Sequence, residues 1–367
     1  MTKKTNRASN RVFSQGLALC LLLCPAALHA QATVRVLTYN THRDIGGTDS
    51  LVSDQGALAK VVNYLNPDVW NINEIGGQNS TYNYNTASAG LNNFIKSNLT
   101  IFGPNPQQGV NYFVYLPNSY NATDGFISNA IVSRYPITAT NLYSDGLRGL
   151  EEATIAVPGT ATPLADFVLH LKSSASGTAA SDAGKRQTEA DADKANIAGF
   201  VSAGDAVVVT GDFNETQDAD ETSAYPIGSP VTTANGSEPY HPITTVEQAG
   251  LSDPAPVSVT GDKDTFRSSS TNPVERIDYT LYSPGNMTYL SGQVFSTVEY
   301  SPAQLAALNA ANNTSFVSTD SSNASDHLPV LSVLQINPAP EPSGTLALVI
   351  GTSLLGVFAF RSRPRVA

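Results

Sequence analysis

Short apolar runs of strand length recur through the middle of this chain, and a polar residue directly follows many of them. Nine runs have the β-branched and aromatic content of strands: Val34–Tyr39, Val69–Ile72, Tyr112–Leu116, Ala130–Val132, Thr154–Val157, Phe167–Leu171, Ala206–Thr210, Ile277–Leu281 and Val330–Leu334. Helical spacing is found in fewer segments, Gln55–Leu65, Leu91–Leu99 and Asp182–Val201. Segments 76–90 and 217–245 are rich in Gly, Ser, Thr, Asn and Pro, which predicts surface loops. Because no linker divides residues 31–337, we expect one α/β domain there.

The composition excludes several classes of protein. The 367 residues are 41% hydrophobic and 14% charged, so the chain can bury a sizeable core and is not disordered throughout. Its two cysteines, Cys20 and Cys24, lie in a segment that we expect to be removed. A disulfide scaffold and cysteine-based zinc or thiol chemistry are therefore excluded.

Residues 1–30 have the pattern of a secretory signal peptide. Four basic residues open the segment, and an apolar stretch, 16–28, is too short to span a bilayer comfortably. Ala30 or Ala32 is a plausible cleavage point, and an uncleaved anchor is the alternative. A lipoprotein site is disfavoured because Leu23, rather than a small residue, precedes Cys24.

Residues 338–367 carry a second terminal signal. Pro340-Glu341-Pro342 precedes 18 uncharged residues, 343–360, and basic residues follow. The run can just span a membrane with its basic end in the cytoplasm. The arrangement resembles the PEP-CTERM sorting signal of Gram-negative bacteria, which implies an exosortase-type processing enzyme as a partner; a plain C-terminal anchor is the alternative. We expect an exported protein, extracellular or on the cell surface, transiently anchored in the inner membrane and touching it only through the terminal segments.

Removing both ends makes the body strongly acidic. All 31 Asp and Glu residues lie within residues 31–342, whereas seven of the 20 Lys and Arg residues lie outside this range. Residues 31–342 thus carry a charge of about −18. Such a body repels phosphate backbones at long range, so nucleic-acid binding requires a locally basic groove, divalent cations or both.

Polar residues after the apolar runs supply groups suited to metal and proton chemistry. Strand ends present side chains to a common crevice, and the residues there are Asn40, Glu74, His170, Asp212 with Asn214, Asp278, and Asp326 with His327. Each alone is weak, since an Asn after a strand is usually a turn residue and a lone acid a solvated charge. As a set, their oxygen ligands suit Mg²⁺, Mn²⁺ or Ca²⁺ rather than zinc. Two histidines beside such a metal suit phosphoryl chemistry.

The ordered series resembles the endonuclease/exonuclease/phosphatase superfamily, which includes deoxyribonuclease I. The most specific elements are Gly211-Asp212-Phe213-Asn214 and Ser325-Asp326-His327-Leu328-Pro329-Val330, with Arg276-Ile277-Asp278-Tyr279 between them. The resemblance covers about residues 33–336. It implies an α/β fold of four layers, in which two packed mixed β-sheets are flanked by helices.

The resemblance also implies a role for each matching residue. Glu74 is the expected principal metal ligand, with Asn40 and Asp326 completing a site for Mg²⁺ (or Mn²⁺ or Ca²⁺). Catalytic roles fall to Asp212, which orients or deprotonates the attacking water, and to Asn214, which holds the scissile phosphate. His327, fixed by Asp278, contacts a phosphate oxygen, and His170 stabilises developing negative charge. Whether one metal or two act stays open, as does the identity of the general base.

Some positions depart from the family pattern. The usual Gln before the metal-binding Glu is Asn73, a shorter amide that can still bond across the site. Leu169 replaces the usual polar residue before His170, which leaves the orientation of that histidine open. The family's mid-chain tyrosine or histidine has one candidate, Tyr115, as a substrate-binding residue.

Four further basic or imidazole side chains differ in how well their positions suit substrate contact. Arg43 and His42 follow Asn40 closely and could reach a substrate phosphate, with an exposed loop as the alternative. For Arg148 a surface position is favoured over a phosphate contact. His241 lies in a predicted loop and is interpreted as incidental.

The predicted function is that of an exported, divalent-metal-dependent phosphoesterase. A phosphodiesterase or nuclease that hydrolyses extracellular nucleic acid is favoured, and the charge of about −18 is the main argument against it. The alternatives are a phospholipid hydrolase of the sphingomyelinase type, or a small-molecule phosphoesterase. A non-catalytic surface binding protein is disfavoured because no metal or water residue is missing from the set.

Overall fold

The structure is a computed structural model, and it describes residues 31–43, 45, 54–76, 82–118, 127–173, 179–216, 240–267 and 275–337. The predicted signal peptide (1–30) and sorting segment (338–367) lie outside these residues. Within the described residues, no helix is both long enough and apolar enough to cross a membrane.

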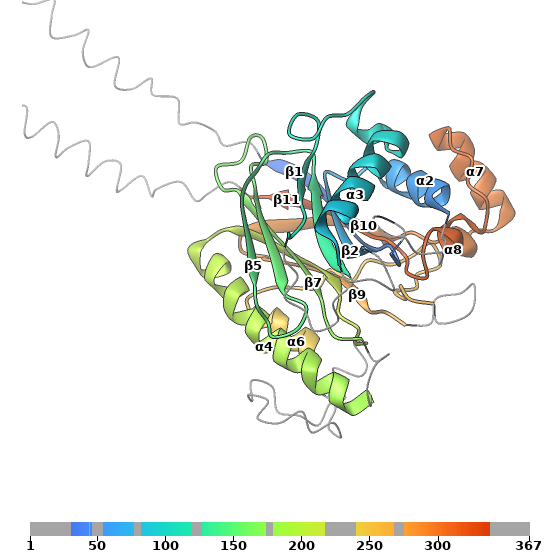
Figure 1. The fold of residues 1–367 in the computed structure, drawn as a ribbon. Coiled ribbons are helices and arrows are strands. Elements are labelled where there is room, and N and C mark those ends of the chain that lie inside the picture. Colours follow the sequence, from blue (N-terminus) through green and yellow to red (C-terminus); the bar gives the residue numbers. More distant parts are fainter. Residues whose placement is uncertain are drawn as a thin grey trace, which may run out of the picture.

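Two mixed sheets pack face to face (Figure 1). The first has six strands in the order β10-β11-β1-β2-β4-β3, and the second has five in the order β5-β6-β7-β8-β9. Pairing is parallel between β1 and β2 and between β7 and β8, and antiparallel elsewhere. The strand bounds are β1 Ala32–Asn40, β2 Val69–Ile75, β3 Phe113–Tyr115, β4 Ser128–Ser133, β5 Ile137–Tyr143, β6 Leu150–Ile155, β7 Leu164–His170, β8 Ala206–Asp212, β9 Asp278–Tyr282, β10 Met287–Val294 and β11 Val330–Ile336.

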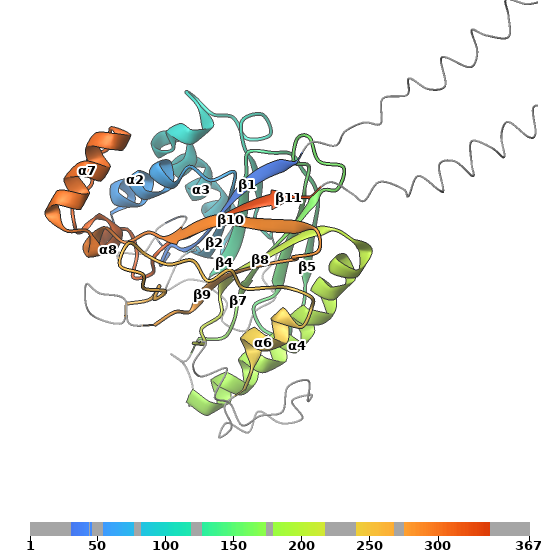
Figure 2. The same ribbon diagram turned by 180° about the vertical axis from the view of Figure 1, so that it is seen from behind.

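Helices cover both outer faces of this pair of sheets (Figure 2). The first sheet is covered by α2 (Gln55–Leu65) and α3 (Tyr84–Asn98), and the second by α4 (Ala179–Ala203) and α6 (Pro242–Glu247). Further helical elements are η1 (Thr100–Phe102), η3 (Thr297–Glu299), α7 (Pro302–Asn312) and α8 (Asp320–Ala324). The predicted four-layer α/β sandwich is confirmed.

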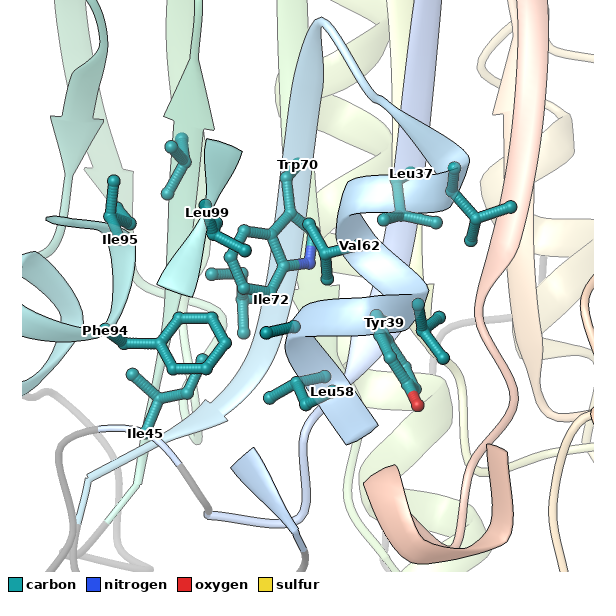
Figure 3. Close-up of a cluster of buried hydrophobic side chains, with 14 of the residues drawn as sticks. Leu37, Tyr39, Ile45, Leu58, Val62, Trp70, Ile72, Phe94, Ile95 and Leu99 are labelled. Carbon is teal, nitrogen blue, oxygen red and sulfur yellow. The ribbon is translucent and has the colours of Figure 1, made fainter. Parts of the chain in front are cut away.

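The outer core of the first sheet shows why α2 forms where the sequence predicts it. Asp54 caps the helix by accepting from the Gly56 amide at 2.8 Å, and Asn66 ends it in the left-handed conformation. Its apolar face then packs over the sheet, where Trp70 lies 6.1 Å from the Phe94 ring of α3 (Figure 3). Burial of these aromatic rings is a main source of stability for this half.

The layer between the sheets changes from apolar to polar along the strands. On β1, Val34 and Val36 face the second sheet, and by strand alternation Thr38 and Asn40 continue the same row. On β8 the matching row is Ala206, Val208, Thr210 and Asp212. Strands β1 and β8 thus begin in an apolar core and end in a group capable of chemistry. The gradient positions the candidate site at one edge of the sandwich.

Asp166 on β7 is buried in the middle of this layer. One carboxylate oxygen accepts from Asn71 at 3.0 Å, and the same Asn71 amide reaches Thr210 in the opposite sheet at 2.8 Å. Burial raises the pKa of Asp166 to about 8, and nearby Glu152 adds to the rise. The carboxyl group is therefore mostly protonated in the folded protein at neutral pH.

We expect Asp166→Asn to flatten the pH dependence of stability. A carboxyl group whose pKa is raised on folding stabilises fully below its unfolded pKa of about 4, and this stabilisation is lost as the pH rises towards 8. The free energy of unfolding in urea should lose a slope of about 1.4 kcal/mol per pH unit over this range in the variant. Asp262→Asn, at an exposed aspartate, is the control. Parallel curves for wild type and Asp166→Asn contradict the prediction.

Three predictions about local structure are wrong. Segment 76–90 was expected to be a loop, but α3 begins at Tyr84, where Asn83 caps it by accepting from the Thr86 amide at 3.1 Å. Within 217–245, also expected to be a loop, α6 begins at Pro242. The strand predicted at Thr154–Val157 begins earlier, at Leu150, because two acids, Glu151 and Glu152, occupy buried strand positions.

Candidate active site

The predicted residues converge at the polar edge of the sandwich, from both sheets. Asn40 ends β1 and Glu74 lies in β2, whereas His170 ends β7, Asp212 ends β8 and Asp278 begins β9. Asp326 and His327 lie just before β11. Parallel pairing in each sheet explains part of this placement, because it puts the carboxyl ends of β1 and β2, and of β7 and β8, side by side.

Asp212 is the centre of the cluster. Its Oδ2 accepts from the Asn40 amide at 3.1 Å, and its Oδ1 accepts from the Asn214 main-chain amide at 2.8 Å. Two imidazole Nε2 atoms lie near the same Oδ2, that of His170 at 3.6 Å and that of His327 at 3.8 Å. Burial raises the pKa of Asp212 to about 7, with His327 opposing the rise and Asp278 adding to it. An aspartate with this pKa can exchange a proton near neutral pH.

His327 is held as a cation. Its Nδ1 lies 2.8 Å from Asp278 Oδ2, and the Ser325 hydroxyl accepts from its main-chain amide at 3.1 Å. Burial lowers the pKa of His327, but Asp278, Asp212 and Asp326 together outweigh burial and raise the pKa to about 10. Asp278 lies where it was predicted to fix the orientation of this imidazole.

His170 has the opposite protonation state. Burial is the main reason why the pKa of His170 lies well below its ordinary value. Four nearby positive or ionisable groups lower this pKa further: Arg148, His327, Arg43 and Lys172. His170 is therefore neutral at physiological pH. Two histidines in different charge states thus face one carboxylate.

Glu74, Asn40 and the turn after β1 form the more open part of the site. Asn40 donates to Glu74 Oε1 at 3.3 Å, and Arg43 Nε lies 3.2 Å from Glu74 Oε2. His42 lies 3.6 Å from Asp326 Oδ1 and donates its main-chain amide to Asn40. His42 and Arg43 thus line the site, whereas an exposed loop was the alternative.

Several residues of the candidate site have a strained backbone conformation. Four non-glycine residues of the site have positive φ: His42, Arg43, Glu74 and Asn214, with values from 48° to 68°. Such conformations cost about 1–3 kcal/mol each and persist where the surrounding structure imposes them, often at functional sites.

The donor set fits a divalent metal ion. Glu74, Asp326 and Asn40 offer hard oxygens, and Glu74 and Asp326 remain partly exposed, as a hydrated ion requires. A second group, Asp212, Asp278 and His327, has potential ligand atoms within 4.8 Å of one another. In that group, His327 Nδ1 already bonds Asp278, so we interpret it as a proton-handling cluster and the first as the metal ligands.

Two predicted residues have other contacts. The Asn214 side chain donates to the Leu171 carbonyl at 2.9 Å, beside the site. Tyr115 is not brought to the cluster by its described contacts, since its hydroxyl donates to the Asn141 carbonyl at 3.0 Å between β3 and β5. Its proposed role in substrate binding has no support from this contact.

Two side chains outside the predicted site have buried positions. Arg148 is buried rather than on the surface, and it donates to the Leu171 carbonyl at 3.0 Å. Strand β6 follows directly, which explains why the surface prediction failed. His241 is also buried, and its main-chain amide donates to Gln187 at 2.8 Å.

The residues that sequence reasoning missed are those that connect the site to the rest of the fold. Asn129 bonds Glu151 and is linked to the Asp212 main chain through Asn73, and Arg186 on α4 bonds Glu215, next to Asn214 in sequence, at 2.8 Å. The one feature of the sequence that indicated such buried polar contacts is the acid pair Glu151-Glu152, which interrupts an apolar pattern.

Comparison with known proteins identifies the family of this chain. The sequence profile of the endonuclease/exonuclease/phosphatase family matches residues 37–327, which is most of the chain. The chain belongs to this family. No curated protein matches the sequence. Members of the family are divalent-metal-dependent phosphoric ester hydrolases, and a site that combines oxygen ligands with a buried Asp-Asp-His group agrees with that chemistry.

Solved structures show the same fold at low sequence identity. A family protein from Bacteroides thetaiotaomicron is 16% identical with a TM-score of 0.53, covering 84% of this chain and 99% of its own. A mannosyl-6-phosphatase from the same species is 16% identical with a TM-score of 0.52, covering 82% and 99%. A family protein from Bacteroides vulgatus, also 16% identical, has a TM-score of 0.51 and covers 83% and 100%.

Proposed function

We propose that this member of the family is an exported phosphodiesterase, a nuclease that hydrolyses extracellular nucleic acid. The observation that carries the phosphoesterase chemistry is the pair of histidines in opposite charge states beside Asp212. Environments that push the pKa values of neighbouring groups apart assign acid and base roles. His327 supplies the positive charge, and Asp212 is the group able to accept a proton.

The residues divide the work as follows. Asp212 orients the attacking water and takes up its proton, because its pKa of about 7 lies near the working pH. Protonated His327 donates a hydrogen bond from Nε2 to a phosphate oxygen, while Asp278 keeps the ring in place. Neutral His170 donates a hydrogen bond to the leaving oxygen, where negative charge develops. Glu74, Asp326 and Asn40 would hold a divalent ion, which would supply positive charge beside the phosphate.

Basic side chains near the cluster support an anionic substrate despite the acidic body. The partly exposed Arg43 and the buried Arg148 and Lys172 lie close enough to His170 to lower its pKa. An acidic nuclease requires local positive charge at its site, and Arg43 is the one of these three cations placed to meet a substrate phosphate. Export, processing by an exosortase-type enzyme and membrane contact through the terminal segments complete the proposal; they are supported by the sequence of residues 1–30 and 338–367.

The test is an assay of the purified protein with Mg²⁺, Mn²⁺ or Ca²⁺ against plasmid DNA, RNA, sphingomyelin and bis-p-nitrophenyl phosphate. Metal-dependent nicking of the plasmid or cleavage of RNA supports the proposal. Turnover of sphingomyelin or the small diester without cleavage of nucleic acid assigns the alternative phosphoesterase function. No turnover of any substrate contradicts the proposal.

Metal binding is expected to stabilise the protein and to depend on Glu74. A ligand present at 100 times its dissociation constant adds about 2.7 kcal/mol to the free energy of unfolding, which a thermal melt with Mn²⁺ or with chelator can measure. Glu74→Gln should lose most of this gain and most of the activity. Glu275→Gln, at an exposed glutamate, should keep both. An equal gain in the Glu74 variant contradicts the assignment of this ligand.

A further inference from the structure

We infer that Asn73, Asn129 and Glu151 form a chain of positioning residues, which we call the amide relay, and that it sets the main chain of His170 and Asp212 for hydrolysis. The inference rests on the function proposed above, because it concerns the same site. All three side chains are buried, and none belongs to the metal or proton-handling groups described above.

Asn73 extends from β2 of the first sheet into the end of the β7–β8 ladder of the second. Its Oδ1 accepts from the Asp212 main-chain amide at 3.1 Å, and its Nδ2 donates to the Leu169 carbonyl at 2.9 Å. The parallel register pairs His170 with Asp212, so this amide and this carbonyl are the two groups that a regular ladder brings together. One side chain thus contacts the backbone of both strands where each presents a reacting residue.

The rest of the relay fixes the Asn73 amide in one orientation. Its Nδ2 also donates to Asn129 Oδ1 at 2.8 Å, and Asn129 Nδ2 donates to Glu151 Oε2 at 2.7 Å. Because each amide uses its oxygen as acceptor and its nitrogen as donor, flipping Asn73 would break the bonds at both of its ends. Buried, fully connected chains of this kind rigidify a site.

The relay also accounts for an observation left open by the sequence. Leu169 is apolar, so the side chain before His170 cannot orient the imidazole through a hydrogen bond. Asn73 instead holds the main chain next to His170, by donating to the Leu169 carbonyl. An amide one carbon shorter than the family's usual Gln fits this close approach between β2 and the β7–β8 ladder.

The relay predicts a loss of turnover without a loss of substrate binding. Asn73 contacts backbone rather than substrate, so Asn73→Ala should lower kcat about 100-fold through misplacement of Asp212 and His170, with KM within threefold of wild type.

Asn71→Ala is the matched control. Asn71 lies two residues earlier on the same face of β2, is equally buried and bonds across to the second sheet, but it contacts no reacting residue. Its kcat should stay within about threefold of wild type. Equal losses of kcat in the two variants overturn the inference.

The far end of the relay gives a second test, which holds even if Asn73→Ala does not fold. Glu151→Gln keeps an acceptor oxygen for Asn129 and should stay within about twofold of wild-type kcat. Glu151→Leu removes the acceptor and should lower kcat about tenfold. Equal kcat values in these two variants overturn the relay.

Wild-type protein in the same assays separates the two failures. If wild type turns over no phosphate ester with any metal, the proposed function fails. If wild type is active and the relay variants match their controls, the relay alone fails.

Discussion

Asp212→Asn is expected to lower kcat by about 10³–10⁴-fold while the protein stays folded. Asparagine keeps the size of the side chain and an oxygen for the Asn214 amide, but it cannot take a proton from water. It also removes the negative charge that lies 3.6 Å and 3.8 Å from the two imidazole Nε2 atoms. The measurement is steady-state hydrolysis of the best substrate from the screen, together with a thermal melt.

Asp166→Asn is the matched control for this loss. It makes the same chemical change at an equally buried aspartate in the same inter-sheet layer, further from the site edge. Its kcat should remain within about threefold of wild type. A loss of less than tenfold in Asp212→Asn is incompatible with proton transfer through this carboxylate.

Gly211→Ala is expected to have the largest effect on stability, about 3–5 kcal/mol. Gly211 has a φ of 141°, and a Cβ atom there would lie 1.9 Å from the Leu169 carbonyl oxygen. Neither backbone can move away easily, because both belong to the β7–β8 ladder beside the site. For a domain with a free energy of unfolding of 5–15 kcal/mol, such a loss leaves little margin. Urea denaturation measures it.

Gly204→Ala separates the effect of conformation from the effect of the clash. Gly204 precedes the same strand with a φ of 86°, and its Cβ would meet no atom within 4 Å. The cost there should be about 1–2 kcal/mol. If both variants lose the same amount, the close approach to Leu169 does not explain the glycine.

The sequence predicts the residues of the site better than the side chains that hold them. Asn40, Glu74, His170, Asp212, Asp278 and His327 are found together because each stands at the end of a recognisable strand. Pairing of these strands brings their ends to one edge of the sandwich. Order along the chain, residue type and strand position were enough to expect this.

What could not be predicted depends on tertiary packing. Edge strand β5 has mostly exposed or half-buried residues and no clear alternation. Helix α7 begins with a capping box at Ser301 and Gln304, a signal in the sequence that strand-centred reasoning overlooked. The relay joins Asn73 to Asn129 and Asn129 to Glu151, and no periodicity reveals pairs 56 and 22 residues apart.

The pairing of β1 with β11 determines where the catalytic edge lies relative to the two ends of the described body. Ala32 lies opposite Ile336, so the described body begins and ends at one corner. Strand β1 then runs about 25 Å to Asn40 at the catalytic edge. A tether through either terminal extension would therefore join the body at the end of β1 opposite the catalytic edge. Substrates would arrive from the surrounding medium, so tethering by either end suits a soluble polymer better than the lipids of the anchoring membrane.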